Sequence, residues 1–201
     1  MNHPLRCRCG KLTGNVSHPE KASRGVCYCK DCQAFAHFLG TPGGILDDMG
    51  GTDVIATLPK YVTFTQGVEA LSCMSLSETG MLRWYAGCCN TPIGNTSRDF
   101  RFSHVGLIHT CLKDPSRTLE ASFGPVRMRV NAKHAKGKPA SMTISTIASI
   151  VRFLSLLIRA RLDGSYRQTP FFASDRGTPV VTPKVLTSSE RERVMNAVQQ
   201  T

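Results

Sequence analysis

Short runs in which apolar and polar residues alternate fill much of the chain up to about residue 130, and glycine and proline separate them. Alternation with a period of two between such breaks is typical of β-strands. The expected strands span residues 12–16, 25–29, 53–57, 61–64, 71–76, 81–86, 102–110 and 117–130. Closely spaced short strands predict a mainly β fold built from antiparallel sheets.

Helical periodicity replaces the alternation in the last third of the chain. Over residues 141–163 large apolar residues recur at steps of three and four, which predicts an α-helix with Ser141 as its N-cap. Gly164 suits the C′ position that ends such a helix. An extended arm is expected over residues 164–172.

Two shorter helices complete the expected elements. One spans about residues 33–39 and ends at Gly40, and the other begins at the capping box Thr187-Ser188-Ser189-Glu190. We therefore predict two parts of the chain, a zinc-binding β domain over residues 1–130 and a helical extension with an extended arm over residues 131–201.

The helix expected over residues 141–163 is not predicted to span a membrane, because its apolar run is too short and Arg152 interrupts it. A wide apolar face is stable only when it is covered. We therefore expect this helix to pack on the β domain or on another subunit, and a homodimer through the helix is one predicted arrangement.

Nine cysteines in 201 residues stand out from an otherwise ordinary globular composition, 41% hydrophobic and 19% charged. Residues 1–7 contain no apolar signal region, so we expect a cytoplasmic, reducing compartment. In such a compartment clustered cysteines indicate metal sites before disulfides.

The formal net charge of +11 indicates an anionic partner, and the chain stays basic even when bound thiolates and zinc are counted. An acidic small molecule, a nucleic acid and a membrane surface all fit this charge. The basic run at residues 127–138 has no interleaved aromatic residues on which bases could stack. We predict that this run is a solvated linker and that nucleic acid is not a partner.

Three cysteines within six residues form the densest chemical motif, Cys27-x-Cys29-x-x-Cys32. On a strand Cys27 and Cys29 point to the same side, and a tight turn then returns Cys32 to that point. Three converging sulfurs suit zinc and leave one of its four tetrahedral positions open, as in catalytic sites. The alternative is a structural zinc knuckle whose fourth ligand comes from elsewhere.

Two further cysteine pairs lie far from each other in the sequence, Cys7 with Cys9 and Cys88 with Cys89. Seven clustered cysteines predict two zinc ions per chain, one in a closed site made by the two pairs and one in an open site at the triad. The remaining cysteines, Cys73 and Cys111, are isolated among apolar residues and are expected in the core.

Charged and titratable residues near the triad in sequence are candidates for supporting roles. Lys30 and Arg24 are expected to offset the negative charge of three thiolates. His37 and His104 are the candidate general bases by residue type, with structural roles as the alternative.

Three motifs occur in a characteristic order: Cys7-x-Cys9-Gly10, then Cys27-x-Cys29-x-x-Cys32, then Arg83-Trp84-Tyr85 to Cys89-x-Thr91-Pro92. Together they resemble the glutathione-dependent formaldehyde-activating (GFA) and centromere-protein-V family, as an uncharacterised divergent branch. The resemblance implies a zinc-stapled β fold and carbon–sulfur chemistry that condenses glutathione with formaldehyde. It implies a catalytic zinc at the triad and a structural zinc at Cys7, Cys9 and Cys89.

The late motif departs from that family's Cys-x-x-Cys-Gly-Thr, because Ala86 and Asn90 stand at its first cysteine and its glycine. Cys88 is the replacement ligand in this interpretation. Adjacent strand residues point to opposite faces, so Cys88 and Cys89 bind one ion only if the chain turns there, which Gly87 and Asn90 allow. Otherwise Cys88 is free or serves the other site.

Two functions from different classes fit the sequence. The first is a zinc-dependent carbon–sulfur lyase that activates the thiolate of glutathione, or of another thiol adduct, at the triad. The second is a non-catalytic, zinc-stabilised binding or scaffold module that uses the basic surface or the helical extension. The expected small-molecule partner of the first is a thiol such as glutathione.

Overall fold

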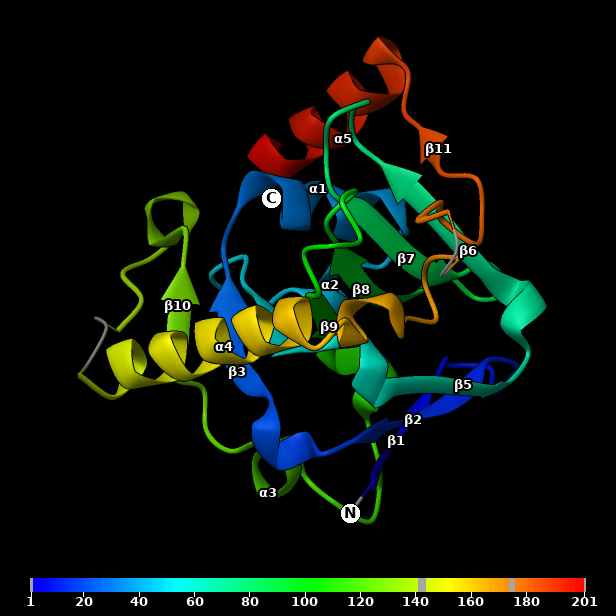
Figure 1. Cartoon of the computed structure of the whole chain (residues 1–201). Helices are drawn as coiled ribbons and strands as arrows, with labels where there is room; N and C mark the ends of the chain where they lie inside the picture. Colours follow the sequence, from blue (N-terminus) through cyan, green and yellow to red (C-terminus); the bar gives the residue numbers. More distant parts are fainter. Residues whose placement is uncertain (1, 141–143, 174–175, 201) are drawn as a thin grey trace.

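The computed structural model of the chain describes residues 2–140, 144–173 and 176–200, and Figure 1 shows two sheets with helices around them. The large sheet has eight strands in the order β10 (Met128–Val130), β3 (Ser23–Cys27), β4 (Thr52–Thr57), β9 (Val105–Ile108), β8 (Thr91–Thr96), β7 (Leu82–Ala86), β6 (Leu71–Ser75) and β11 (Lys184–Val185). The small sheet has three strands in the order β1 (Asn2–Arg6), β2 (Thr13–Ser17) and β5 (Val62–Gln66).

Five α-helices accompany the sheets, so the fold is mixed α/β rather than mainly β. They are α1 (Lys30–Phe38), α2 (Pro42–Ile45), α3 (Leu119–Phe123), α4 (Ile144–Leu162) and α5 (Ser188–Gln200). Short 3₁₀ turns connect the elements at η1 (Pro19–Lys21), η2 (Pro59–Tyr61), η3 (Val68–Ala70), η4 (His109–Leu112), η5 (Ala132–His134) and η6 (Ser165–Arg167).

Antiparallel pairing joins the inner strands of the large sheet, while both of its outer strands pair in parallel. β10 runs alongside β3, with Met128 opposite Gly25, and β11 runs alongside β6, with Lys184 opposite Met74. The solvated linker predicted at residues 127–138 is therefore wrong at its start, because its first residues form an edge strand of the sheet.

The strand predicted over residues 117–130 is also wrong in its first half, which forms α3. The Thr118 side chain caps this helix, because its Oγ1 accepts a hydrogen bond from the Ala121 amide at 3.1 Å. A threonine N-cap satisfies one of the amides that have no partner in the first turn, and this local bond outweighs the strand-like pattern.

Trp84 lies at the centre of the main core and is fully buried. Its Nε1 donates to Thr96 Oγ1 at 2.9 Å, and the ring packs against Phe171 at a centroid distance of 5.1 Å and Phe172 at 6.2 Å. The extended arm predicted after Gly164 therefore completes the core of the strands that precede it. The division into parts at residues 1–130 and 131–201 stays a prediction.

Two helix termini follow their sequence signals. The capping box at the start of α5 is confirmed, since Thr187 N donates to Glu190 Oε2 at 2.9 Å and Glu190 N donates to Thr187 Oγ1 at 3.3 Å. Gly164 follows α4 in the left-handed region, with φ 74°. The predicted N-cap Ser141 lies outside the described residues.

The helices α4 and α5 cover different parts of the sheets. Figure 1 shows α5 (red) beside α1 (blue), while α4 (yellow) crosses in front of the large sheet. α4 buries Leu157 and Ala160 together with Leu58. In the described parts of the chain, no helix combines the length and the apolar character that a membrane span needs.

Phe171→Ala tests whether the arm stabilises the core. The ring is fully buried and also contacts Phe64 at 5.7 Å, so its loss should lower the free energy of unfolding by about 3–5 kcal/mol. Urea unfolding followed by the fluorescence of Trp84, the single tryptophan, measures the change. The matched control Val180→Ala removes a side chain that is 46% exposed on the segment that pairs with Phe171, and should cost about 0.5 kcal/mol or less. Equal losses in the two variants would contradict this packing.

Candidate metal centres

Four cysteine sulfurs from two distant segments form the first centre, which we call the four-cysteine centre. Cys7 and Cys9 follow β1, while Cys88 and Cys89 lie in the turn between β7 and β8. Their Sγ atoms are 3.5 Å apart for Cys7–Cys9, 3.8 Å for Cys7–Cys88, 3.4 Å for Cys9–Cys88 and 3.9 Å for Cys88–Cys89. All four lie within 4.8 Å of one another.

These sulfur separations match the edges of a zinc-sized tetrahedron. A zinc–sulfur bond of about 2.3 Å places tetrahedral sulfurs about 3.8 Å apart. A disulfide would instead require a separation of about 2.05 Å, and all nine cysteines are free. The four-cysteine centre can therefore hold a metal ion such as zinc with a complete set of protein ligands.

Cys88 and Cys89 both reach this centre because the chain turns sharply there. Asn90 adopts φ 54°, the left-handed conformation that asparagine tolerates, and Cys89 N donates to Ala86 O at 3.3 Å to close the turn. The same turn is anchored by Gly87 N, which donates to Ala70 O at 2.8 Å. The structure thus places both adjacent sulfurs in one cluster.

Hydrogen bonds around the four-cysteine centre favour thiolates. Leu12 N donates to Cys7 Sγ at 3.3 Å, and the Thr91 hydroxyl lies 3.1 Å from Cys89 Sγ. Burial raises the pKa of Cys89, but the bonds from Thr91 and from Cys9 outweigh it and lower that pKa to about 6. Burial raises the pKa of Cys88 to about 12. Hydrogen bonding thus favours the thiolate form of Cys89, while burial opposes the thiolate form of Cys88.

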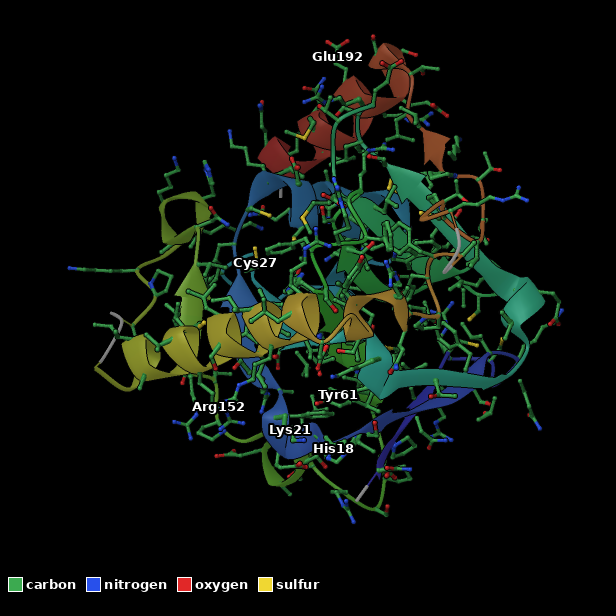
Figure 2. All side chains as sticks on the ribbon, in the orientation of Figure 1. His18, Lys21, Cys27, Tyr61, Arg152 and Glu192 are labelled. Carbon is green, nitrogen blue, oxygen red and sulfur yellow. The ribbon has the colours of Figure 1, made fainter. Side chains whose placement is uncertain are left out.

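Three sulfurs at the junction of β3 and α1 form the second centre, which we call the triad. Cys27 ends β3, Cys29 is the N-cap of α1, and Cys32 lies in the first turn of that helix. Their Sγ atoms lie within 4.8 Å of one another, and Figure 2 labels Cys27 where β3 leads toward α1. The strand and the turn bring the sulfurs together as the sequence predicts.

The triad sulfurs differ in exposure and in hydrogen bonding. Cys32 is buried, whereas Cys27 and Cys29 are half-buried. Cys32 N donates to Cys29 Sγ at 3.4 Å, and Asn131 Nδ2 donates to Cys27 Sγ at 3.6 Å. The Cys29 and Cys32 thiols donate to Cys27, which lowers its pKa to about 2 and raises the pKa values of the other two. The hydrogen bonds within the triad thus favour the thiolate form at Cys27, on its partly exposed side.

Arg83 is the functional residue that sequence reasoning missed. It projects from β7, is only 2% exposed, and its Nη1 donates to Cys32 Sγ at 3.8 Å. Asn95 Oδ1 accepts from the same nitrogen at 3.2 Å, and Asp31 lies 3.8 Å from Nη2. Three thiolates and one Zn²⁺ carry one net negative charge, which a buried guanidinium offsets. The available signal was a charged residue inside the otherwise apolar strand at residues 81–86.

Arg24, one of the two cations expected to support the triad, pairs with another residue. Arg24 instead pairs with Asp53 through two hydrogen bonds, from Nε at 3.1 Å to Oδ1 and from Nη2 at 2.6 Å to Oδ2. Lys30 is exposed. Side chains on a strand alternate faces, so the faces of Arg24 and Arg83 could not be assigned before the pairing of their strands was known.

The two candidate histidines are not among the described contacts of the triad sulfurs. His37 lies five residues after Cys32, about 7.5 Å along the helix axis, and burial and Lys136 lower its pKa. His104 contacts Phe153 of α4 at a ring distance of 5.6 Å, and burial lowers its pKa to about 4. Their role as general bases stays a prediction.

A cavity of 510 Å³ borders the four-cysteine centre rather than the triad. Arg6, Arg8 and Lys113 line it, and the described lining residues include no carboxylate. A zinc ion with four thiolates carries two net negative charges, and these cations offset them. Cys73 and Cys111 belong to neither centre and are confirmed in the core.

Comparison with known proteins places the chain in a family. Residues 1–182 match the family described as "Family of unknown function (DUF6151)". The match is not to the GFA and centromere-protein-V family, so the likeness to that family rests on the cysteine motifs. No curated protein matches the chain.

Zinc content distinguishes the two centres. We expect two zinc ions per chain, and one after Cys29→Ser, because two remaining triad sulfurs bind zinc weakly. Elemental analysis of purified protein measures the ratio. Cys73→Ala, which removes a cysteine from outside both clusters, should leave two. Two zinc ions in Cys29→Ser, or one in the unaltered chain, would contradict the assignment.

Arg83→Gln tests the role of the buried guanidinium. Without it the negative charge of the triad is uncompensated, so zinc affinity at the triad should fall about 10–100-fold. Competition with a chromogenic chelator measures the affinity. Lys30→Gln removes the same charge from an exposed position and should change it little. Zinc retained at the four-cysteine centre shows that the variant is folded; an unchanged triad affinity in that folded variant would rule out this role.

Proposed function

We propose a function from the metal centres themselves, because the chain belongs to DUF6151, a family of unknown function. In this proposal the protein holds two zinc ions, one structural and one open to a substrate. The open centre is the triad, and the substrate class is a small thiol, such as glutathione, or its adduct with a carbonyl compound. The activity is that of a carbon–sulfur lyase.

The triad carries this proposal because it offers three ligands where the other centre offers four. Its buried sulfur, Cys32, faces Arg83, while Cys27 and Cys29 are partly exposed. A fourth position on the exposed side would be free for an exchangeable ligand, as in catalytic zinc sites. A soft thiolate is the ligand that best matches such a sulfur-rich site.

The four-cysteine centre is assigned a structural role. Its four sulfurs fill a tetrahedron and leave no position for a substrate. It also joins the small sheet, through the segment after β1, to the large sheet at the β7–β8 turn. Metal binding there would contribute directly to the free energy of folding.

Each residue of the triad has a part in the proposed chemistry. Cys27, Cys29 and Cys32 would hold zinc, which supplies a Lewis-acidic position where a thiol binds as its thiolate. Arg83 donates to Cys32 on the buried side of the triad, and its positive charge would offset the net negative charge of the zinc and three thiolates. Asn131 donates to Cys27 and borders the exposed side. The assignment of carbon–sulfur chemistry comes from the resemblance of the motifs to the GFA family.

A second function, a zinc-stabilised binding module, is favoured by a different observation. The outer face of α4 exposes several large apolar side chains, which is unusual for a surface without a partner. In that case both metal centres are structural and the helix does the binding.

The enzymatic proposal is tested by adding the protein to glutathione and formaldehyde. Nuclear magnetic resonance exchange measures how fast their adduct forms and breaks down. The two-zinc protein should accelerate formation and breakdown of the carbon–sulfur bond, and Cys29→Ser should abolish the acceleration while it keeps the structural zinc. Cys73→Ala is the control that keeps full activity.

Replacement of zinc by cobalt tests whether the triad has an open position, independently of which reaction the protein catalyses. If the triad has an open position, glutathione should change the visible absorption of the cobalt protein, and the change should vanish in Cys29→Ser. Absence of both the spectral change and the catalysis, with two metals bound, would leave the binding-module function.

A further inference from the structure

The outer face of α4 is an exposed apolar stripe. Its large side chains are exposed by 61% at Ile147, 37% at Ile150, 61% at Val151, 49% at Leu154, 59% at Ile158 and 81% at Leu162. Their spacing of three and four residues keeps them on one side of the helix. The other side is occupied, because Leu157 and Ala160 are buried. The exposed stripe is therefore not needed to pack the helix against the rest of the protein.

A second segment extends the stripe. Phe102, between β8 and β9, is 53% exposed and lines a cavity of 440 Å³ together with Leu154, Ile158 and Leu162. Two segments far apart in the sequence thus build one apolar surface, which we call the α4 surface. Soluble monomers rarely expose a contiguous apolar surface of this kind unless it binds something.

Basic side chains border the α4 surface. All charged residues of α4 are arginines, Arg152, Arg159 and Arg161, and all three are exposed. The Arg152 guanidinium donates to the carbonyl of Glu20 in η1, and Arg161 lies over the Tyr166 ring at 4.8 Å. Two of the three arginines are thus held by contacts with neighbouring elements.

More cations lie beside the helix. Lys21 and Lys60 are placed over the Tyr61 ring at 5.4 Å and 5.5 Å. Figure 2 shows His18, Lys21, Tyr61 and Arg152 on the same side of α4. Three acidic groups nearby have basic partners: Glu20 contacts His18 at 3.2 Å, Asp99 pairs with Arg101 at 2.9 Å, and Asp163 lies 4.0 Å from Lys60.

We propose that the α4 surface docks on an anionic membrane surface. A helix that lies in the interface buries an apolar face among the acyl chains and places arginines at the lipid phosphates. Arginine stems pack along the apolar face while their guanidinium groups reach the headgroups. A second copy fits less well, because all charged side chains of α4 itself are arginines, and two such helices would repel each other. The net charge of +11 acts in the same direction.

Co-sedimentation of the full-length, zinc-loaded protein with vesicles tests the proposal. The protein should bind vesicles of phosphatidylcholine with about 30% phosphatidylserine, bind pure phosphatidylcholine at least about tenfold more weakly, and be released by salt. Val151→Glu places a charge in the stripe and should lower binding about tenfold or more.

The chain offers a matched control for this variant. Val68→Glu introduces the same charge at a residue that is 46% exposed outside the α4 surface, and should bind nearly as the unaltered protein does. Two zinc ions per chain in each variant show that folding is intact. Equal binding of both variants, or no binding to either vesicle, overturns the proposal. So does a dimer in solution that Val151→Glu dissociates, since a second copy would then cover the face.

Discussion

The convergence of four sulfurs from segments about eighty residues apart is the constraint on which the arrangement of the two sheets depends. Cys7 and Cys88 are 3.8 Å apart across that sequence separation. The small sheet has three strands and a limited core of its own, so a tie to the large sheet stabilises it disproportionately. A metal at this centre would fix the end of β1 against the β7–β8 turn.

Strand β7 and helix α1 connect the four-cysteine centre to the triad. β7 carries Arg83, which faces Cys32, and then leads into the turn that carries Cys88 and Cys89. α1 begins at the triad and ends at Leu39, whose carbonyl accepts a hydrogen bond from Asn90 of the same turn at 3.5 Å. β7 and α1 thus both link the triad to the turn that carries Cys88 and Cys89.

Features that depend on neighbouring residues could be predicted from the sequence, whereas pairings between distant segments could not. The capping box of α5, the left-handed Gly164 and the cysteine motif at the start of α1 depend on neighbouring residues, and each forms as expected. The parallel edge strand β10 depends on a partner about one hundred residues away, so the basic composition of its segment was misleading.

The same division explains the candidate site. The spacing of the cysteines predicted two clusters, since each ligand pair is local. The contact of Arg83 with Cys32 could not be predicted, because it depends on the position of β7 relative to α1. Arg24 was expected to offset the charge of the triad, but it pairs instead with Asp53 on the neighbouring strand β4. Charge compensation across strands is decided by tertiary structure rather than by proximity in the sequence.

X-ray absorption at the zinc edge tests the central claim most directly, that one centre is closed and the other is open. The average zinc should be bound by about 3.5 sulfurs and 0.5 lighter atoms, because one site has four thiolates and the other three. Addition of a small thiol should raise the sulfur count to about 4. Four sulfurs before any thiol is added, or a count that thiol leaves unchanged, would contradict an open triad.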